Sequence, residues 1–539
     1  MLRRLRTGLR PLHSGSRPNY QARVCVIGSP FNLLLFHSGS GSESGCSTPL
    51  LPPPLSQTQS PLSNLDHGRR RRRLHFPYHF LSTLPANSNN PAMNGDASHS
   101  KKKPKLSPPE ISSEFSHHDP AVARINNGSF GCCPRSVTAA QRDWQHQFLR
   151  QPDNFFLNLL QPAISRSRSL VASLVNAPHV DQISLVDNAT TAAAIFLQHC
   201  AWSFAEGRFS PGDAAVMLHY AYGAVKKSVE AYITRAGGHV IEVDLPFPVK
   251  SEDEIITEFR KALAKGKSEG RKVRIAVIDH VTSMPAVVIP VKELVKICRE
   301  EGVEQVFVDA AHGIGCVDVD VQEIGADFYT SNLHKWFFCP PSVAFLYCRN
   351  QSNAGGDTQL QLHHPVVSHE YGNGLPVESG WIGTRDYSAQ LVVPSAAEFV
   401  ERFPGGIDGI KAANHSAVVE MGEMLAKAWG TNLGSPPEMC GSMIMVGLPA
   451  CLGIGSESDS LKLRTHLRDC FAVEVPIYFN KRRHDHRGEE AGGGVITGYV
   501  RISYQVYNKV EDYERLRDAV HKLVNDGFTC GSLVEPESD

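Results

Sequence analysis

Short apolar runs alternate with amphipathic helical stretches between residues 182 and 348, and this alternation constrains the fold most. The runs are rich in Val, Ile, Leu and Ala, which predicts buried strands. The predicted strands lie at 182–188, 215–220, 239–244, 274–281, 305–310, 327–331 and 343–348. Predicted helices lie at 189–203, 225–233 and 291–301. Strands joined through helices form a largely parallel sheet covered on both faces, so the sequence predicts an α/β fold.

A smaller α+β region is predicted to follow residue 385. Its helices are expected at 395–403, 410–429 and 510–524, and its short strands near 442–447 and 498–504. We therefore expect three parts, namely a leader over 1–110, a large domain over 111–385 and a small C-terminal domain over 386–539. Within the large domain, the segment 111–150 is expected to pack on the small domain.

The first hundred residues have the composition of a leader. They contain eleven arginines, no lysine and three acidic residues, a net charge of +8, whereas the remaining residues carry −9. An arginine-rich, acid-poor N-terminus is typical of a mitochondrial or plastid transit peptide. The alternative is a disordered extension with Met93 as the working start, which would give a cytoplasmic or nuclear protein. The acidic body does not favour binding of nucleic acid.

Several other classes of protein fit the sequence poorly. The longest apolar stretch, Val24–Phe36, is interrupted by polar residues, Gly and Pro, so no membrane span is expected. The 13 cysteines never occur as C-x-x-C, which favours neither a zinc ribbon nor a disulfide scaffold. The paired histidines at 363–364 and 484/486 lie in polar loops, and we expect no metal site.

Chemically active residues follow the predicted strands. Asn188-Ala189-Thr190-Thr191 opens a helix, where free N–H groups and hydroxyls can bind a phosphate, although an ordinary helix cap is the simpler interpretation. Asp309 ends another strand, and His312 follows it. Lys335 comes directly after a strand, between His and Trp, which favours a lysine that binds a carbonyl group covalently. An anion site, a strand-end Asp and this lysine together match the needs of pyridoxal 5'-phosphate.

These motifs resemble the fold-type-I, class-V aminotransferase superfamily, which includes cysteine desulfurases and isopenicillin-N-epimerase-like enzymes. Within it, the chain is similar to the L-cysteine desulfhydrases of plants. The resemblance runs from about Asn94 to the C-terminus, and its matching segments are 123–131, 184–194, 306–312, 331–341, 381–386 and 500–512. It implies a large domain with a mostly parallel sheet, a smaller C-terminal domain and pyridoxal 5'-phosphate as the cofactor.

The resemblance also implies three catalytic residues. Lys335 would bind the cofactor and move the substrate's α-proton. Asp309 would keep the cofactor's ring nitrogen protonated, and His312 would lie near its phenolic oxygen.

The cofactor's phosphate would be bound by residues from several segments. The resemblance assigns this role to Ala189, Thr190, Ser331 and His334. It also implies that Thr384 reaches the phosphate of the neighbouring subunit, and therefore a homodimer.

Substrate and ring contacts are implied as well. Arg501 would bind the substrate's α-carboxylate, for which its planar fork is suited, and Asn127 would be a second substrate contact. Desulfurases stack a His on the cofactor ring, and this chain offers Tyr220, with Tyr222 as an equal alternative from the sequence. They also have an Asn where Ser283 stands, so Ser283 is a weak candidate.

The reaction is predicted from a missing thiol. Sulfur transfer needs a nucleophilic cysteine on a loop before the carboxylate-binding arginine, and residues 471–500 contain none. We therefore predict that L-cysteine is split into hydrogen sulfide, pyruvate and ammonia. The alternatives are a cysteine desulfurase, which produces alanine, and an epimerase or aminotransferase of the same superfamily. An NAD-dependent oxidoreductase would need a G-x-G-x-x-G motif directly after a strand, and a serine hydrolase would need a G-x-S-x-G motif in the same place. The sequence has neither motif directly after a predicted strand, so both classes are disfavoured.

Overall fold

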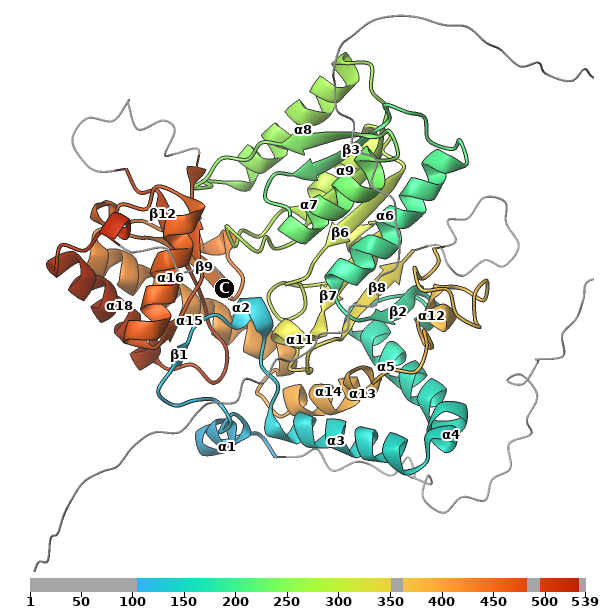
Figure 1. Cartoon of the computed structure of the whole chain (residues 1–539), viewed down its shortest axis with the longest axis horizontal. Coiled ribbons are helices and arrows are strands. Elements are labelled where there is room, and N and C mark those ends of the chain that lie inside the picture. Colours follow the sequence, from blue (N-terminus) through green and yellow to red (C-terminus); the bar gives the residue numbers. More distant parts are fainter. Residues whose placement is uncertain (1–103, 350–361, 482–494, 533–539) are drawn as a thin grey trace, which may run out of the picture. The chain divides into compact units, whose positions relative to one another are not determined.

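Seven strands form the central sheet of the computed structural model, which describes residues 104–349, 362–481 and 495–532. In spatial order they are β2 (Ile183–Val186), β8 (Ala344–Cys348), β7 (Phe328–Asn332), β6 (Gln305–Asp309), β5 (Val273–Asp279), β3 (Ala214–Leu218) and β4 (His239–Val243). Strands β7, β6, β5, β3 and β4 are parallel, whereas β8 runs antiparallel to both β2 and β7 (Figure 1). The α/β prediction is confirmed.

Helices cover both faces of this sheet because its strands are apolar on both sides. Val277 and Phe307 pack with residues of α6 (Ala189–Ala205) and α7 (Gly223–Val229). The alternate residues Ala276 and Val306 belong to the opposite core, which also takes in α5 (Leu160–Leu174), α8 (Glu252–Ser268) and α9 (Val291–Glu300). Alternation of side chains along each strand therefore builds two cores, as expected for a buried parallel sheet.

A second sheet of three antiparallel strands follows later in the chain. Its order is β11 (Ile477–Phe479), β12 (Gly498–Ser503) and β9 (Met443–Gly447). Its core is shared with α15 (Gly406–Trp429), α16 (Glu457–Phe471) and α18 (Val510–Asn525). A short parallel pair, β1 (Ala123–Arg124) with β10 (Val473–Glu474), joins an early segment to this region.

The remaining helices are short or lie in the first third of the chain. They are α1 (Pro108–Glu114), α2 (Asn127–Phe130), α3 (Arg135–Arg150), α4 (Pro152–Asn154), α10 (Val321–Ile324), α11 (Leu333–Trp336), α12 (Leu375–Glu378), α13 (Ser388–Leu391) and α14 (Val393–Glu401). The chain divides into two units, Met1–Asp96 and Ala97–Asp539, and every described residue lies in the second. The boundaries predicted at 110 and 385 remain predictions, and the leader lies outside the described residues.

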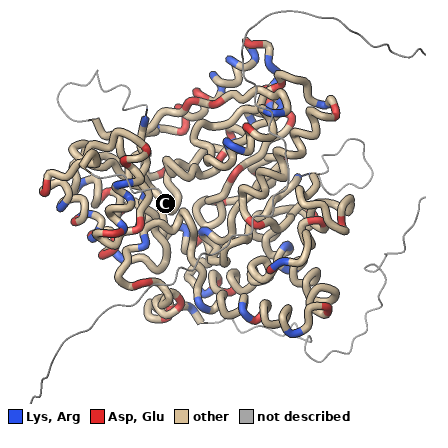
Figure 2. The backbone as a smooth tube through the Cα atoms, viewed as in Figure 1, with Lys and Arg blue, Asp and Glu red and all other residues tan. Residues whose placement is uncertain are grey.

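The surface of the described residues carries mixed charge. Basic and acidic residues are interspersed along the outer helices (Figure 2). Within the described ranges, no helix is long and apolar enough to cross a membrane.

The strand ends determine where a ligand can bind. Parallel strands β5, β6 and β7 all end at the same edge of the sheet, and β7 continues directly into α11. Helix α2 packs against α11 at this edge (Figure 1). Ligands of open α/β sheets bind at such an edge, so the candidate residues gather there.

Candidate active site

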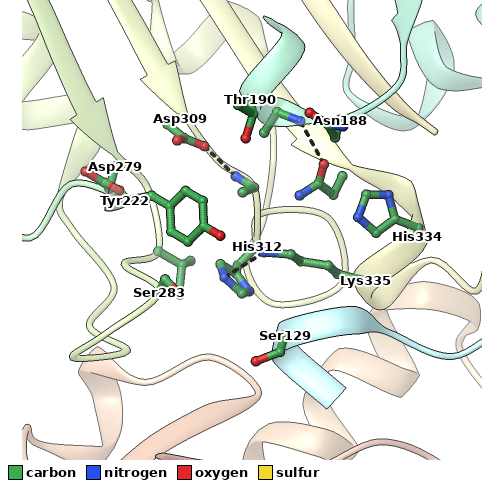
Figure 3. Close-up of a pocket in the computed structure, with 14 residues that line it drawn as sticks. Ser129, Asn188, Thr190, Tyr222, Asp279, Ser283, Asp309, His312, His334 and Lys335 are labelled. Atoms are coloured by element: carbon green, nitrogen blue, oxygen red, sulfur yellow. Dashed lines mark hydrogen bonds between the residues drawn. The ribbon is translucent and has the colours of Figure 1, made fainter. Parts of the chain in front are cut away.

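A pocket lies at the carboxyl ends of the parallel strands, where the sequence predicted it (Figure 3). Its volume is about 170 Å³. The predicted site residues that line it are Ala189, Thr190, Asp309, His312, His334 and Lys335. Tertiary structure thus brings together residues from three separate sequence segments.

Lys335 lies in α11, directly after β7, with its amine inside the pocket. Burial and the positive charge of Arg501 lower the pKa of Lys335 to about 8. The ordinary pKa of lysine is about 10.4. Because a neutral amine is both a base and a nucleophile, this lysine is reactive close to physiological pH.

His312 orients the lysine amine. The indole Nε1 of Trp336 donates to Nδ1 of His312 at 3.3 Å, so Nδ1 carries no proton. Burial and the charge of Lys335 hold the pKa of His312 well below its usual range, so the ring is neutral. Its proton is therefore on Nε2, which lies 3.1 Å from Nζ of Lys335 and can donate to the amine once the amine is neutral.

Asn127 positions the lysine's backbone from the other side. Its Nδ2 donates to the carbonyl oxygen of Lys335 at 3.0 Å, and the hydroxyl of Tyr507 donates to its Oδ1 at 3.2 Å. Gly131, with φ of +72°, packs so closely that a Cβ there would lie 1.8 Å from the carbonyl oxygen of His334. Asn127 thus lies behind the lysine turn and does not line the pocket. Its predicted contact with the substrate stays a prediction.

Asp309 ends β6 and is buried at the pocket wall. Its Oδ1 accepts a hydrogen bond from the backbone N–H of Ala311 at 3.0 Å. Burial raises the pKa of Asp309, while this hydrogen bond and the charge of Lys335 act in the opposite direction. A buried carboxyl at this place can pair with a cationic N–H of a ligand ring.

The first turn of α6 forms an anion-binding corner. The side chain of Asn188 caps the helix by accepting from the N–H of Thr191 at 2.9 Å, and Asn332 accepts from the N–H of Ala189 at 2.9 Å. The side chain of Thr190 lines the pocket beside these groups. A helix N-terminus with a hydroxyl is a suitable binding site for phosphate.

His334 lies on the same side of the pocket. Its Nδ1 donates to the carbonyl of Val343 at 3.0 Å, and burial lowers the pKa of His334 to about 4. The free protein therefore holds His334 neutral. An anion beside its ring would favour the charged form, because an opposite charge raises the pKa of a histidine.

Two of the predicted phosphate contacts lie elsewhere. Ser331 is fully buried, and its Oγ accepts from the N–H of Ile314 at 3.1 Å, so it anchors the loop after β6. Thr384 is exposed in a loop that does not line the pocket. Its predicted role depends on a second subunit and stays a prediction.

The structure separates the two candidate tyrosines. Tyr222 is 50% exposed and lines the pocket, with its ring facing the cavity (Figure 3). Tyr220 is buried, and its hydroxyl donates to the carbonyl of Pro246, away from the pocket. Tyr222 therefore replaces Tyr220 as the candidate stacking ring. Sequence alone could not decide, since the turn after β3 determines which ring points into the cavity.

Arg501 lies buried directly behind the pocket wall, with an exposed fraction of 2%. Its guanidinium donates to the backbone carbonyl oxygen of Ser283 at 2.7 Å, to Oδ1 of Asn126 at 2.9 Å and to Oγ of Ser129 at 2.7 Å. Ser129 and Ser283 line the pocket. Burial lowers the pKa of Arg501 to about 10.

The charge of Arg501 is uncompensated. Within the described residues its hydrogen-bond partners are neutral, and its Nε has no partner. A buried charge without an opposite charge is costly, so an anionic ligand would complete the site electrostatically. This agrees with the predicted carboxylate-binding role.

Sequence reasoning missed three residues of this region. Ser129 lines the pocket from α2, and Asp279 lines it from the end of β5. Cys316 is buried close enough to Lys335 for the two to affect each other's pKa. Asp279 ends a strand, which is the same signal that identified Asp309. For Ser129 and Cys316, no pattern among their sequence neighbours indicates a place near the site.

A mostly parallel sheet with a lysine, a buried aspartate and a helix N-terminus at one edge is typical of a fold-type-I enzyme. The model of the family described as aminotransferase class-V matches residues 156–434. The chain belongs to this family.

Similar proteins and a similar solved structure support this family membership. The chain is 71% identical to "Probable L-cysteine desulfhydrase, chloroplastic" of Arabidopsis thaliana, over 80% of this chain and 90% of that protein. It is 66% identical to "Putative L-cysteine desulfhydrase 1" of Oryza sativa subsp. japonica, over the same shares. The crystal structure of the Escherichia coli cysteine desulfurase CsdA has the same fold, with a TM-score of 0.56 at 18% identity, covering 78% of this chain and 99% of that one.

Proposed function

We propose that this chain is a pyridoxal 5'-phosphate-dependent lyase that converts L-cysteine and water into hydrogen sulfide, pyruvate and ammonia. The observation that carries the proposal is one pocket that combines a lysine of lowered pKa with a buried, uncompensated arginine directly behind its wall. The two similar plant proteins are named as L-cysteine desulfhydrases, which supports this substrate.

The residues present fit the cofactor. The first turn of α6, with Thr190, supplies donors for a phosphate. Asp309 supplies a buried carboxyl for the ring nitrogen, Lys335 supplies the amine for the aldehyde, and Tyr222 supplies an aromatic face. When bound, pyridoxal 5'-phosphate provides an electron sink for the pair of electrons released at the substrate's α-carbon.

The chain's own residues bind the substrate and move its proton. Arg501, together with Ser129 and Ser283, binds the α-carboxylate, which fixes the orientation of the amino acid. Lys335 takes the α-proton at Nζ, and His312 keeps the amine in place through its Nε2–H. Asp309 would keep the ring nitrogen of a bound cofactor protonated through its negative charge.

Sulfur then leaves the β-carbon as free sulfide, because no described residue of the pocket offers a nucleophilic thiol that could accept it as a persulfide. Among the described residues, no cysteine lines the pocket. Burial raises the pKa of Cys316 to about 12, so its thiol stays protonated and is a poor nucleophile. Cys470 is exposed near the end of α16. Hydrosulfide departs with the C–S bonding pair, and the remaining aminoacrylate is hydrolysed to pyruvate and ammonia.

The products test this proposal directly. Purified protein with L-cysteine should release sulfide and pyruvate in about equal amounts without added reductant, and little alanine. The two are measured in the same reaction, together with alanine and ammonia. Cys470→Ser and Cys316→Ser should keep most of the activity. Alanine as the main product, with a persulfide trapped on either cysteine, would make the chain a desulfurase.

The pKa of Lys335 predicts how cofactor attachment depends on pH. Only the neutral amine attacks the aldehyde, so the rate should rise with pH to a plateau, with a midpoint near the lysine's pKa of about 8. An exposed lysine would have its midpoint near about 10.4. The rate is followed by visible absorbance after adding cofactor to cofactor-free protein.

An arginine variant serves as the matched control for this midpoint. The charge of Arg501 lowers the pKa of Lys335, so Arg501→Gln should move the midpoint to higher pH. If the unaltered protein has a midpoint near that of an exposed lysine, the amine is not activated as described.

A homodimer is proposed as the functional form. Thr384 is exposed outside its own pocket, as a contact to a second subunit requires. The nearby segment 362–378 exposes Val366, Val367 and Tyr371, each more than half accessible. Exposed apolar side chains that cluster in this way are typical of an interface.

We propose the plastid as the compartment, with the basic N-terminal residues as the transit peptide. The composition of residues 1–100 supports a transit peptide, and the chloroplastic relative supports the plastid over the mitochondrion. Residues 1–92 fused to a fluorescent protein should enter plastids in leaf cells. A fusion that stays in the cytosol would contradict the transit peptide and leave the enzyme proposal intact.

A further inference from the structure

A second carboxyl group lies beside Asp309 at the pocket wall. Asp279 ends β5 and Asp309 ends β6, and the two residues are direct partners in the parallel register (Figure 3). Both are buried, with exposed fractions of 3% and 4%, and both line the pocket. Paired positions on neighbouring strands point to the same face of a sheet, so the two carboxyls face the same small volume.

Their hydrogen bonds differ. Asp309 accepts from the N–H of Ala311, which stabilises an ionised carboxylate. The backbone N–H groups of Asp279 itself and of Tyr222 lower the pKa of Asp279, but its Oδ2 is buried and has no partner among the described residues. An ionised oxygen left without a donor in a buried place is costly, whereas a protonated one is not charged.

The surrounding charges favour the same distribution. Burial and the charge of Asp309 raise the pKa of Asp279, while Lys226 on α7 opposes them weakly. Lys335 lowers the pKa of Asp309 and thereby favours its charged form.

The other titratable neighbours add no charge. Burial lowers the pKa of His280 to about 4 and that of His312 well below its usual range. Burial raises the pKa of Tyr329 well above its usual value. At neutral pH these groups are uncharged, so the two carboxyls and Lys335 determine the charge at this end of the pocket.

We propose that Asp279 and Asp309 work as one unit that holds a single proton, with the proton on Asp279 and the negative charge on Asp309. Asp279 is then a positioning residue, because it acts on a bound ring only through the charge of Asp309. The unit presents one negative charge to one cationic ring N–H. Two ionised carboxylates would leave an excess charge buried, and two protonated ones would leave the ring without a counter-charge. The ring's identity rests on the proposed function, whereas the proton on Asp279 is a property of the chain itself.

Infrared difference spectroscopy of the cofactor-free protein tests the proposal. The carbonyl band of a protonated carboxylic acid should be present at neutral pH and absent in Asp279→Asn. Asp213→Asn is the matched control, since Asp213 is also buried but is ion-paired with Arg274 at 2.7 Å and lies outside the pocket. That control should keep the band.

A second variant tests the coupling of the two carboxyls. Asp309→Asn removes the neighbouring negative charge, so the band should remain but titrate at lower pH, by about one pH unit or more. This measurement decides the question even if Asp279→Asn does not fold. The proposal is overturned if Asp279→Asn leaves the band unchanged or if Asp309→Asn leaves its midpoint unmoved. Because no substrate is present, a failed lyase assay would not affect these results.

Discussion

Replacing Lys335 by alanine should lower sulfide release from L-cysteine by about 10³-fold or more. General base catalysis alone is worth about 10²–10⁴-fold, and the same amine is the group that would hold the cofactor. No other lysine among the described residues lines the pocket, so none can take over its role. Initial rates of sulfide and pyruvate release measure the loss, and visible absorbance reports the bound cofactor.

The matched control for this variant is Lys227→Ala. Lys227 is an exposed lysine whose ion pair with Glu230 lies on the surface, so its removal should leave activity and absorbance unchanged. A Lys335→Ala protein that keeps both its absorbance band and its turnover would remove this lysine from the active site.

Arg501→Lys should weaken the apparent affinity for L-cysteine by about 30- to 10³-fold. Loss of one partner of a buried, hydrogen-bonded charge pair costs about 2–4 kcal/mol, which corresponds to this range. An ammonium group cannot reproduce the planar fork, which the present contacts to Ser283, Asn126 and Ser129 hold in one orientation. Cofactor affinity should change much less. Titration with cofactor and steady-state kinetics separate the two effects.

A second buried arginine provides the comparison. Arg168 donates to the carbonyl of Ile183 at 2.8 Å and pairs with Asp181, away from the pocket. Arg168→Lys should lower the thermal stability and leave the affinity for L-cysteine unchanged. An Arg501→Lys protein with normal affinity would show that another group binds the carboxylate.

Local patterns predicted the sheet well because each strand carries its own signal. The runs around β5 and β6 are apolar on both faces, and each predicted strand between 182 and 348 overlaps a strand of the structure. Helix α8 was missed, although its face toward the sheet is apolar. Strand β11 was missed because three residues are too few to show an alternation of apolar and polar side chains. Only their pairing with β12 identifies them as a strand.

For the site, strand ends were the informative signal. Asp309 ends one strand and Lys335 lies in the turn of helix that follows another, so the sequence could place them at one edge of a parallel sheet. The role of Asn127 as a substrate contact stays a prediction, and its contact with the Lys335 carbonyl was not foreseen because it joins residues 208 positions apart. The choice between Tyr220 and Tyr222 stayed open at the level of sequence for a similar reason, since neither residue's neighbours in sequence determine which ring faces the cavity.

The sequence by itself determined the α/β class, indicated the family, and singled out the lysine, the aspartate and the arginine as candidate site residues. These follow from short apolar runs and from motifs, which are properties of neighbouring residues. Only the tertiary structure decided the chemical state of the site. The pKa of Lys335, the tautomer of His312, the uncompensated charge of Arg501 and the proton assigned to Asp279 all depend on burial and on distant residues. Desolvation and charge interactions are non-local, and therefore no sequence pattern records them.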